Sequence, residues 1–182
     1  MAAGDSGADL LLLLIDIDYF KSINDRHSHA AGDRVLTSIA TVLRDHIRDS
    51  DLAIRWGGDE FLVVSRSFHR AHAAGSVGRL CQAVEALGLA LAKENGPACT
   101  VSIGYAAFPF LVHEPKALTW EQTLELADRA LLLTKRRGRN THTGLRAGPD
   151  VTARSVIACL AGTSAAPLPE GVETLIPGTR DA

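Results

Sequence analysis

Charged residues stand in three places where they could hold a metal ion and phosphate together. Asp16 and Asp18 end an aliphatic run, and Asp59 and Glu60 follow two glycines. The third place is a basic group near residue 140: Lys135, Arg136, Arg137 and Arg139. Carboxylate oxygens are ligands that Mg²⁺ prefers, and basic side chains can hold the outer phosphates of a nucleotide. An aliphatic strand that ends in Asp-Ile-Asp also invites a counter-ion, because unpaired buried carboxylates are costly.

Each group also has a structural interpretation that involves no ligand. The two aspartates could cap a helix, which is common at strand ends of α/β proteins. The Gly-Gly-Asp segment could be only a turn between two strands. A basic run at the end of a helix often just complements the helix dipole. Each signal is therefore weak when it is taken alone.

The elements that must position these residues can be predicted from periodicity. The aliphatic run predicts a buried strand over 10–17, followed by a short helix over 19–27. Apolar residues at helical spacing predict an amphipathic helix from Gly32 to Ile47. Residues 52–56 and 61–65 flank the glycines, as in a β-hairpin. Further predicted elements are a helix over 69–93, a strand over 99–106 and a helix over 120–137. The alternation predicts an α/β fold with a mixed central sheet flanked by helices.

Length and composition indicate one domain with a tail. We expect a short lead over 1–9, a domain over 10–146, and a Pro/Gly/Ala-rich tail over 147–182 that is disordered or loosely packed. The net charge of −2 gives no overall attraction to nucleic acid or anionic lipid, so we expect neither as a partner. The apolar run near residue 10 is too short to span a bilayer, and the protein is expected to be cytoplasmic. The cysteines at positions 81, 99 and 159 are expected to be buried thiols.

Taken together, the motifs resemble one known family. Arg55–Phe61 reads Arg-Trp-Gly-Gly-Asp-Glu-Phe and resembles the hairpin that names the GGDEF family of diguanylate cyclases. Asp16–Asp25 is similar to the family's DxDxFKxIND segment, and His29 with Gly32-Asp33 is similar to its HxxGD step. Ser102–Gly104 and Ala127–Asn140 resemble the family's later motifs. The matches run in order from about residue 10 to 140, which implies a nucleotide-cyclase, palm-like fold.

The resemblance also implies a role for each matching position. Mg²⁺ or Mn²⁺ would be bound by Asp16, the carbonyl of Ile17, and Asp59. The catalytic set would be Asp59 as base, Lys21 as a stabiliser of transition-state charge, and Glu60, for which chemistry alone gives no role. The guanine pocket and the phosphate contacts would be formed by Asn24, His29, Asp33, Gly57, Gly58, Lys135 and Arg139.

The activity implied is the condensation of two GTP into cyclic di-GMP and two pyrophosphates. Because one domain of this family holds one GTP, catalysis would need a homodimer with the two sites face to face. Arg48 and Asp51 fit the RxxD pattern at the register of the family's product-inhibition site, and Arg79 is expected to join them. The alternative is an ordinary surface ion pair, worth under about 1 kcal/mol.

Some features depart from the family pattern. Nine residues precede the first predicted strand, and nothing in them resembles the family's DxLTGLxNR segment, so part of one sheet face is expected to lack its cover. His27-Ser28 replaces the usual Phe-Gly, which removes backbone freedom beside the guanine pocket. Leu132 and Thr134 replace Tyr and Ala. Three hypotheses stay open: an active cyclase, a catalytically weak domain that binds cyclic di-GMP or GTP, and a purely structural relic.

Overall fold

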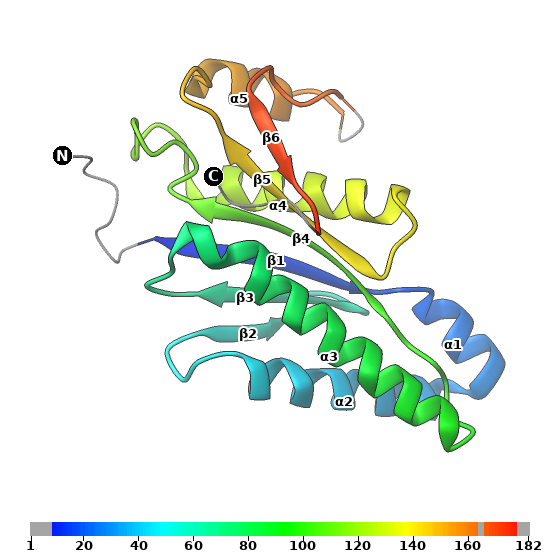
Figure 1. Cartoon of the computed structure of the whole chain (residues 1–182). Coiled ribbons are helices and arrows are strands. Elements are labelled where there is room, and N and C mark those ends of the chain that lie inside the picture. Colours follow the sequence, from blue (N-terminus) through cyan, green and yellow to red (C-terminus); the bar gives the residue numbers. More distant parts are fainter. Residues whose placement is uncertain (1–8, 164–165, 178–182) are drawn as a thin grey trace.

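A mixed six-stranded sheet forms the centre of the molecule (Figure 1). The computed structural model describes residues 9–163 and 166–177. The strands follow the order β2-β3-β1-β4-β5-β6; β4 and β5 are parallel and all other neighbours are antiparallel. Their bounds are β1 (Leu10–Ile17), β2 (Leu52–Arg55), β3 (Glu60–Ser65), β4 (Val101–Phe108), β5 (Thr141–Ala147) and β6 (Val172–Leu175).

Helices cover both faces of this sheet. One face carries α2 and α3, and the other carries α4, with α5 beside it (Figure 1). The helices are α1 (Phe20–His27), α2 (His29–His46), a 3₁₀ turn (Arg70–His72), α3 (Ala73–Lys93), α4 (Trp120–Arg136) and α5 (Ala153–Leu160). The predicted α/β class with a mixed central sheet is confirmed.

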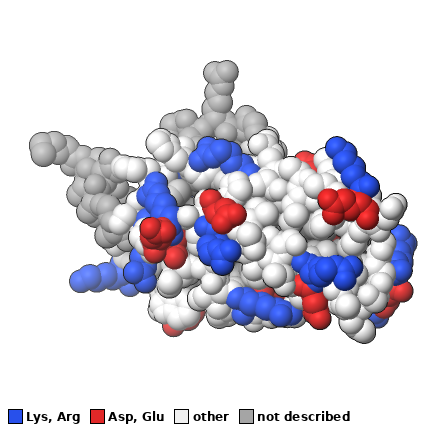
Figure 2. Space-filling model, turned by 90° about the horizontal axis from the view of Figure 1, so that it is seen from below, with Lys and Arg blue, Asp and Glu red and all other residues white. Residues whose placement is uncertain are grey.

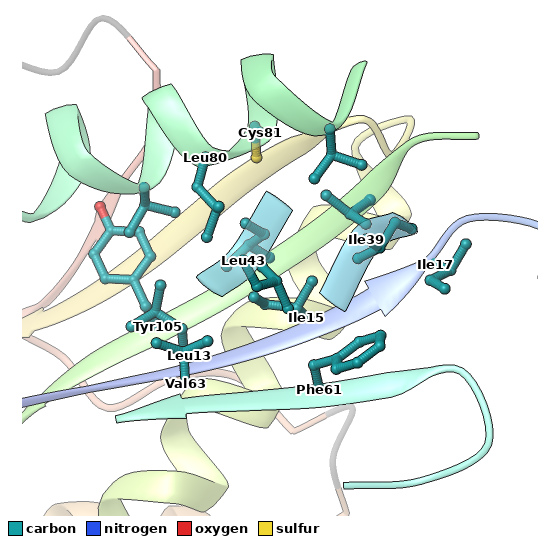
Figure 3. Close-up of a cluster of buried hydrophobic side chains, with 14 of the residues drawn as sticks. Leu13, Ile15, Ile17, Ile39, Leu43, Phe61, Val63, Leu80, Cys81 and Tyr105 are labelled. Carbon is teal, nitrogen blue, oxygen red and sulfur yellow. The ribbon is translucent and has the colours of Figure 1, made fainter. Parts of the chain in front are cut away.

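Alternation along β1 divides the core into two layers. Leu13 and Ile15 point toward α2 and α3, where they meet Phe61, Leu43 and other apolar side chains (Figure 3). Leu14 belongs to the second layer, under α4 and α5. Since β1 is apolar on both faces up to Ile15, the first carboxylate can appear only where the strand reaches the edge of the core.

Close contact between α4 and β4 places the basic end of α4 over the sheet. A Cβ on Gly104 would overlap with the backbone of Ala127 and Leu131, so only glycine allows this approach. The hydroxyl of Thr134 lies 3.0 Å from the carbonyl oxygen of Ile103 and donates across the same interface. Thr119 begins the helix with a capping box. The cap defines where α4 begins, and the contacts of Gly104 and Thr134 hold α4 against β4.

The chain after residue 140 carries elements that the sequence analysis did not predict. β5 lies parallel to β4, and β6 pairs antiparallel with β5. Val151 and Val156 are buried in the second core layer, and Arg129 of α4 donates to the carbonyl oxygen of Cys159 at 2.7 Å. The expectation of a disordered or loosely packed tail therefore fails for α5 and β6. Residues 164–165 and 178–182 of that segment lie outside the described residues.

The sheet is less covered at its β2 edge. Leu52 and Ile54 are 43% and 41% exposed, on the face that α4 covers elsewhere.

All three cysteines are free thiols. Cys81 and Cys99 are buried, and burial raises their thiol pKa values to about 12 and about 11, so both stay protonated. Cys159 is only half-buried, contrary to expectation. None of the helices in the described part of the chain is long and apolar enough to cross a bilayer.

A buried histidine predicts how stability depends on pH. His142 is 4% exposed in β5, and its Nδ1 has no hydrogen-bond partner among the described residues. Burial lowers its pKa from 6.5, because the charged form loses water. The unfolded chain then takes up the proton first, so the free energy of unfolding should fall as the pH drops below about 6.5, by at most about 1.4 kcal/mol per pH unit.

Urea unfolding at pH 7.5 and 5.5 measures this effect. His142→Leu should flatten the pH dependence, whereas the same change at exposed His27 should not. An equal pH dependence in wild type and His142→Leu would exclude His142 as its source.

Candidate metal and nucleotide site

Asp16 is a nearly buried carboxylate at the end of β1. It is 9% exposed, and its Oδ2 lies 2.7 Å from Nζ of Lys135, at the last turn of α4. Burial raises the pKa of Asp16; the Lys135 ammonium opposes this shift, and the charge of Asp59 adds to it. Lys135 thus offsets part of the negative charge of the carboxylates near Asp16.

The Gly-Gly hairpin lies directly beside Asp16. Glu60 is the cross-strand partner of Asp16, and the Ile17 N–H donates to the Asp59 carbonyl oxygen at 3.1 Å. Burial and the charge of Asp16 raise the pKa of Glu60, as do Asp59 and Asp128, while Lys135 opposes the shift. Asp16 and Asp59 are 43 positions apart in the sequence. The structure therefore brings together two acidic segments that are distant along the chain.

The oxygen donors of these groups suit a hard divalent cation. Two carboxylates, Asp16 and Asp59, and the Ile17 backbone are neighbours, and oxygen donors of this kind suit Mg²⁺. Among the described residues, no three Asp, Glu, His or Cys side chains form a metal-binding group by themselves. A cation here would complete its coordination with water and phosphate, which Mg²⁺ normally retains.

The two motif glycines provide space rather than an unusual backbone conformation, since neither has a positive φ. A Cβ on Gly57 would lie 2.9 Å from Oε2 of Glu60, so this glycine leaves room for that carboxylate. Gly58 faces open space, and its carbonyl oxygen accepts from Arg55 at 2.7 Å. The outer side of the turn is therefore accessible to a ligand.

Asn24 presents a buried acceptor between α1 and α2. Its Oδ1 has no hydrogen-bond partner among the described residues. A Cβ on Gly32 would overlap with this oxygen, which explains the glycine of the HxxGD step. Asp33 and His29 are both exposed at the start of α2, near Gly32. Asn24 and Asp33 are the residues from which the resemblance implies guanine contacts.

Ser28 has a backbone conformation that favours glycine. Its φ is 124°, and its side chain accepts from the Ala31 N–H as the N-cap of α2. Such a conformation costs a non-glycine residue about 1–3 kcal/mol. Glycine relieves this strain but loses the side-chain hydrogen bond of the N-cap. On balance, Ser28→Gly should raise the free energy of unfolding by about 1 kcal/mol. Urea unfolding checks this; Ser38→Gly, within α2, should instead destabilise, and a Ser28→Gly variant less stable than wild type would contradict the argument.

Two further basic residues of the predicted site, Lys21 and Arg139, lie at the start of α1. The Arg139 guanidinium stacks over the Tyr19 ring at 4.7 Å, and Lys21 is exposed on the first turn of α1. The N-cap residue Tyr19 makes no side-chain cap, so the first N–H groups of α1 have no such partner. From the sequence, Tyr19 has no predicted role and Asp18 is grouped with Asp16 as a carboxylate that could hold a metal or cap a helix, whereas the structure gives Asp18 hydrogen-bond donors of its own chain.

Arg48, Asp51 and Arg79 line one cavity of about 180 Å³ between α2, β3 and α3. Arg48 and Asp51 also line a neighbouring groove of about 600 Å³ between α2 and β2. Asp51 accepts from the N–H groups of Arg48 and Arg66 and from the hydroxyl of Ser65, at 2.9–3.1 Å. The underside of the molecule, where α2 lies, carries basic and acidic side chains interspersed (Figure 2).

Comparison with known proteins gives a single family. Residues 1–141 match the family model of the diguanylate cyclase GGDEF domain. Diguanylate cyclase DosC of Escherichia coli K12 is 36% identical over 138 residues, which are 76% of this chain and 29% of DosC. The chain thus spans less than a third of the length of that relative.

Solved structures agree with this result. The GGDEF domain of TpbB (YfiN) from Pseudomonas aeruginosa matches with a TM-score of 0.62 and 33% identity, covering 74% of this chain and 80% of that one. The coiled coil and GGDEF domain of DgcB from Caulobacter crescentus, in complex with c-di-GMP, matches with a TM-score of 0.62 and 27% identity, covering 76% and 70%. From the gathered acidic groups, the fold and these matches together, we conclude that this chain belongs to the GGDEF-domain family of diguanylate cyclases.

Proposed function

We propose that this chain condenses two molecules of GTP into cyclic di-GMP and two pyrophosphates, with Mg²⁺ or Mn²⁺ and as a homodimer. The observation that carries the proposal is the juxtaposition of Asp16 with the Asp59–Glu60 turn, where Lys135 forms an ion pair with Asp16. The relatives named as diguanylate cyclases support the same reaction.

The metal would be held by Asp16, Asp59 and the Ile17 carbonyl. When bound, it would lower the proton affinity of the attacking hydroxyl and neutralise charge on the transferring phosphoryl group. The raised pKa of Asp16 supports this assignment, because a carboxylate that is costly to ionise gains most from a nearby cation. Lys135 would then be released from Asp16 to contact phosphate.

Guanine recognition would use Asn24 and Asp33. The buried Oδ1 of Asn24 lacks a donor, and guanine offers N–H donors on its N1 and N2 atoms. The Asp33 carboxylate would accept from the same edge, whereas adenine presents an acceptor at N1. GTP would therefore be preferred over ATP, because adenine would leave these acceptors unpaired. His29 lies near this pocket and would complete it.

The reaction itself requires positioned charges around the transferring group. The 3′-hydroxyl oxygen of one GTP bonds to the α-phosphorus of the other as the bond to pyrophosphate breaks, and Asp59 takes the hydroxyl proton. Lys21, Lys135 and Arg139 would stabilise charge on the phosphates, and open space beside Gly58 would admit the triphosphate. Two such steps, with two domains face to face, close the ring.

Incubation with GTP and Mg²⁺, followed by chromatography, tests the proposal. We expect cyclic di-GMP and pyrophosphate in a 1:2 ratio, at a rate that rises more steeply than linearly with protein concentration. ATP in place of GTP should give no cyclic dinucleotide. No product from GTP at high protein concentration would refute synthesis by this chain.

A second candidate function is binding of cyclic di-GMP at the RxxD position. It is favoured by the cavity that Arg48, Asp51 and Arg79 share. Asp51 is fully engaged by its own chain, whereas no hydrogen bond of the Arg48 guanidinium is found among the described residues. Arg48 would therefore bind the ligand, and Asp51 would hold the loop. In an active cyclase, the same site would give product inhibition.

Arg48→Ala should weaken cyclic di-GMP binding by about 30-fold or more, the loss expected for a charge-assisted contact. Calorimetry with cyclic di-GMP measures this, and Arg154→Ala on α5 is the matched control, since Arg154 is exposed and distant in the fold from this cavity. Unchanged affinity in Arg48→Ala would place the ligand elsewhere, in the substrate pocket.

A further inference from the structure

Asp18 is a buried carboxylate whose partners are groups of its own chain. It is 4% exposed, directly after β1. Its Oδ1 accepts from the Ser102 hydroxyl at 2.6 Å, and its Oδ2 accepts from the Thr100 hydroxyl at 2.7 Å and the Asn140 N–H at 3.0 Å. No Lys or Arg among the described residues forms an ion pair with it. Both oxygens are thus already engaged without a cation.

The turn that Asp18 holds has an unfavourable backbone conformation. Gly138, Arg139 and Asn140 have φ values of 115°, 65° and 47°, and the last two are not glycine. Residues in this region persist when surrounding contacts determine them. Two such contacts are the bond from the Asn140 N–H to Asp18 and the bond from Asn140 Nδ2 to Glu85 at 2.8 Å.

The same turn carries the guanidinium of Arg139 to the proposed phosphate position. The guanidinium carbon lies 4.7 Å from the centre of the Tyr19 ring, and Tyr19 follows Asp18 in the chain. Tyr19 itself has a φ of 56°. Asp18 therefore holds Asn140, the neighbour of Arg139, through its carboxylate, and it is bonded directly to Tyr19. It thus constrains the chain next to both members of the Arg139–Tyr19 stack.

We infer that Asp18 is a positioning residue, which fixes the 138–140 turn and so orients Arg139 toward the outer phosphates of GTP. The contact with phosphate rests on the proposed function, whereas the effect of Asp18 on the Arg139–Tyr19 stack does not. This role differs from that of Asp16, although both belong to one Asp-Ile-Asp segment. Asp16 needs its charge, whereas Asp18 needs an acceptor oxygen for the Asn140 N–H.

Asp18→Asn and Asp18→Ala separate a positioning role from a metal-binding role. Asparagine can place its oxygen where it accepts from the Asn140 N–H, and its amide can donate to the Ser102 hydroxyl oxygen. We expect Asp18→Asn to keep kcat and KM for GTP within about threefold of wild type, and Asp18→Ala to raise KM about tenfold with a smaller change in kcat. The exposed Asp45→Asn is the control.

Three further readouts make the test decisive. In an Arg139→Ala background, Asp18→Ala should have no added effect on KM, because both changes disrupt the same contact between Arg139 and phosphate. The NMR signal of the Arg139 Nε–H, shifted by the Tyr19 ring, should persist in Asp18→Asn and be lost in Asp18→Ala. An Asp18→Asn variant that needs far more Mg²⁺, with that signal unchanged, would overturn the inference even if Asp18→Ala does not fold. If wild type makes no cyclic di-GMP, the proposed function fails, while the NMR signal still tests the positioning.

Discussion

Asp59→Ala should lower the rate of cyclic di-GMP synthesis by about 1000-fold or more, because it removes a metal ligand and the proposed base together. Asp59 stands at the tip of the hairpin, where its carbonyl oxygen is bound by the Ile17 N–H. The backbone contact does not depend on the side chain, so the fold should be retained. Circular dichroism and urea unfolding would verify that point.

The rate is measured by chromatography of products at saturating GTP and Mg²⁺. Asp45→Ala, an exposed change on α2, should leave the rate within about twofold of wild type. An Asp59→Ala variant with more than a tenth of the wild-type rate would show that the chemistry lies elsewhere.

Gly104→Ala should destabilise the protein by about 3 kcal/mol, the upper range for overpacking, and should displace the end of α4. The added methyl group would meet the backbone of Ala127 and Leu131, which cannot rotate away as a side chain can. Because Lys135 reaches Asp16 from the same helix, synthesis should fall with stability. The free energy of unfolding in urea and the rate of synthesis should therefore decrease together.

Gly75→Ala provides a control that should change the free energy of unfolding in the opposite direction. Gly75 lies in α3, and a Cβ there would make only ordinary contact, 3.7 Å from Arg79. Alanine in place of glycine in a helix stabilises by about 0.5–1 kcal/mol. If Gly104→Ala were as stable as Gly75→Ala, the close approach of α4 to β4 would not be what fixes the site.

Local patterns predicted the first 140 residues well for physical reasons. The run before Asp16 is apolar on both faces, which is the pattern of a central strand, and β1 is indeed third of six. The two short apolar runs beside Gly57 and Gly58 predicted the hairpin. Its pairing then determines that Glu60 lies opposite Asp16. These features depend on near neighbours in the sequence, so a pattern can reveal them.

The strands after α4 depend instead on tertiary contacts. β5 reads Thr-His-Thr-Gly-Leu-Arg-Ala, with few apolar residues, and becomes a strand because β4 offers a parallel edge and helices cover both its faces. Asp18 is a similar case within the site. Its partners Thr100 and Asn140 are 82 and 122 positions away, and no local pattern marks them. Gly32 and Gly104 belong to sequence motifs, but the steric reason for each glycine depends on tertiary contacts that no local pattern shows.

Calorimetric titration with a non-hydrolysable GTP analogue tests the central claim most directly: one divalent cation shared by Asp16 and Asp59 beneath the nucleotide. Wild type should bind the analogue at least about tenfold more tightly with Mg²⁺ than with a chelator, and an Asp16→Ala, Asp59→Ala double variant should lose that difference. Equal affinity with and without Mg²⁺ in wild type, or a double variant that keeps the difference, would contradict the account.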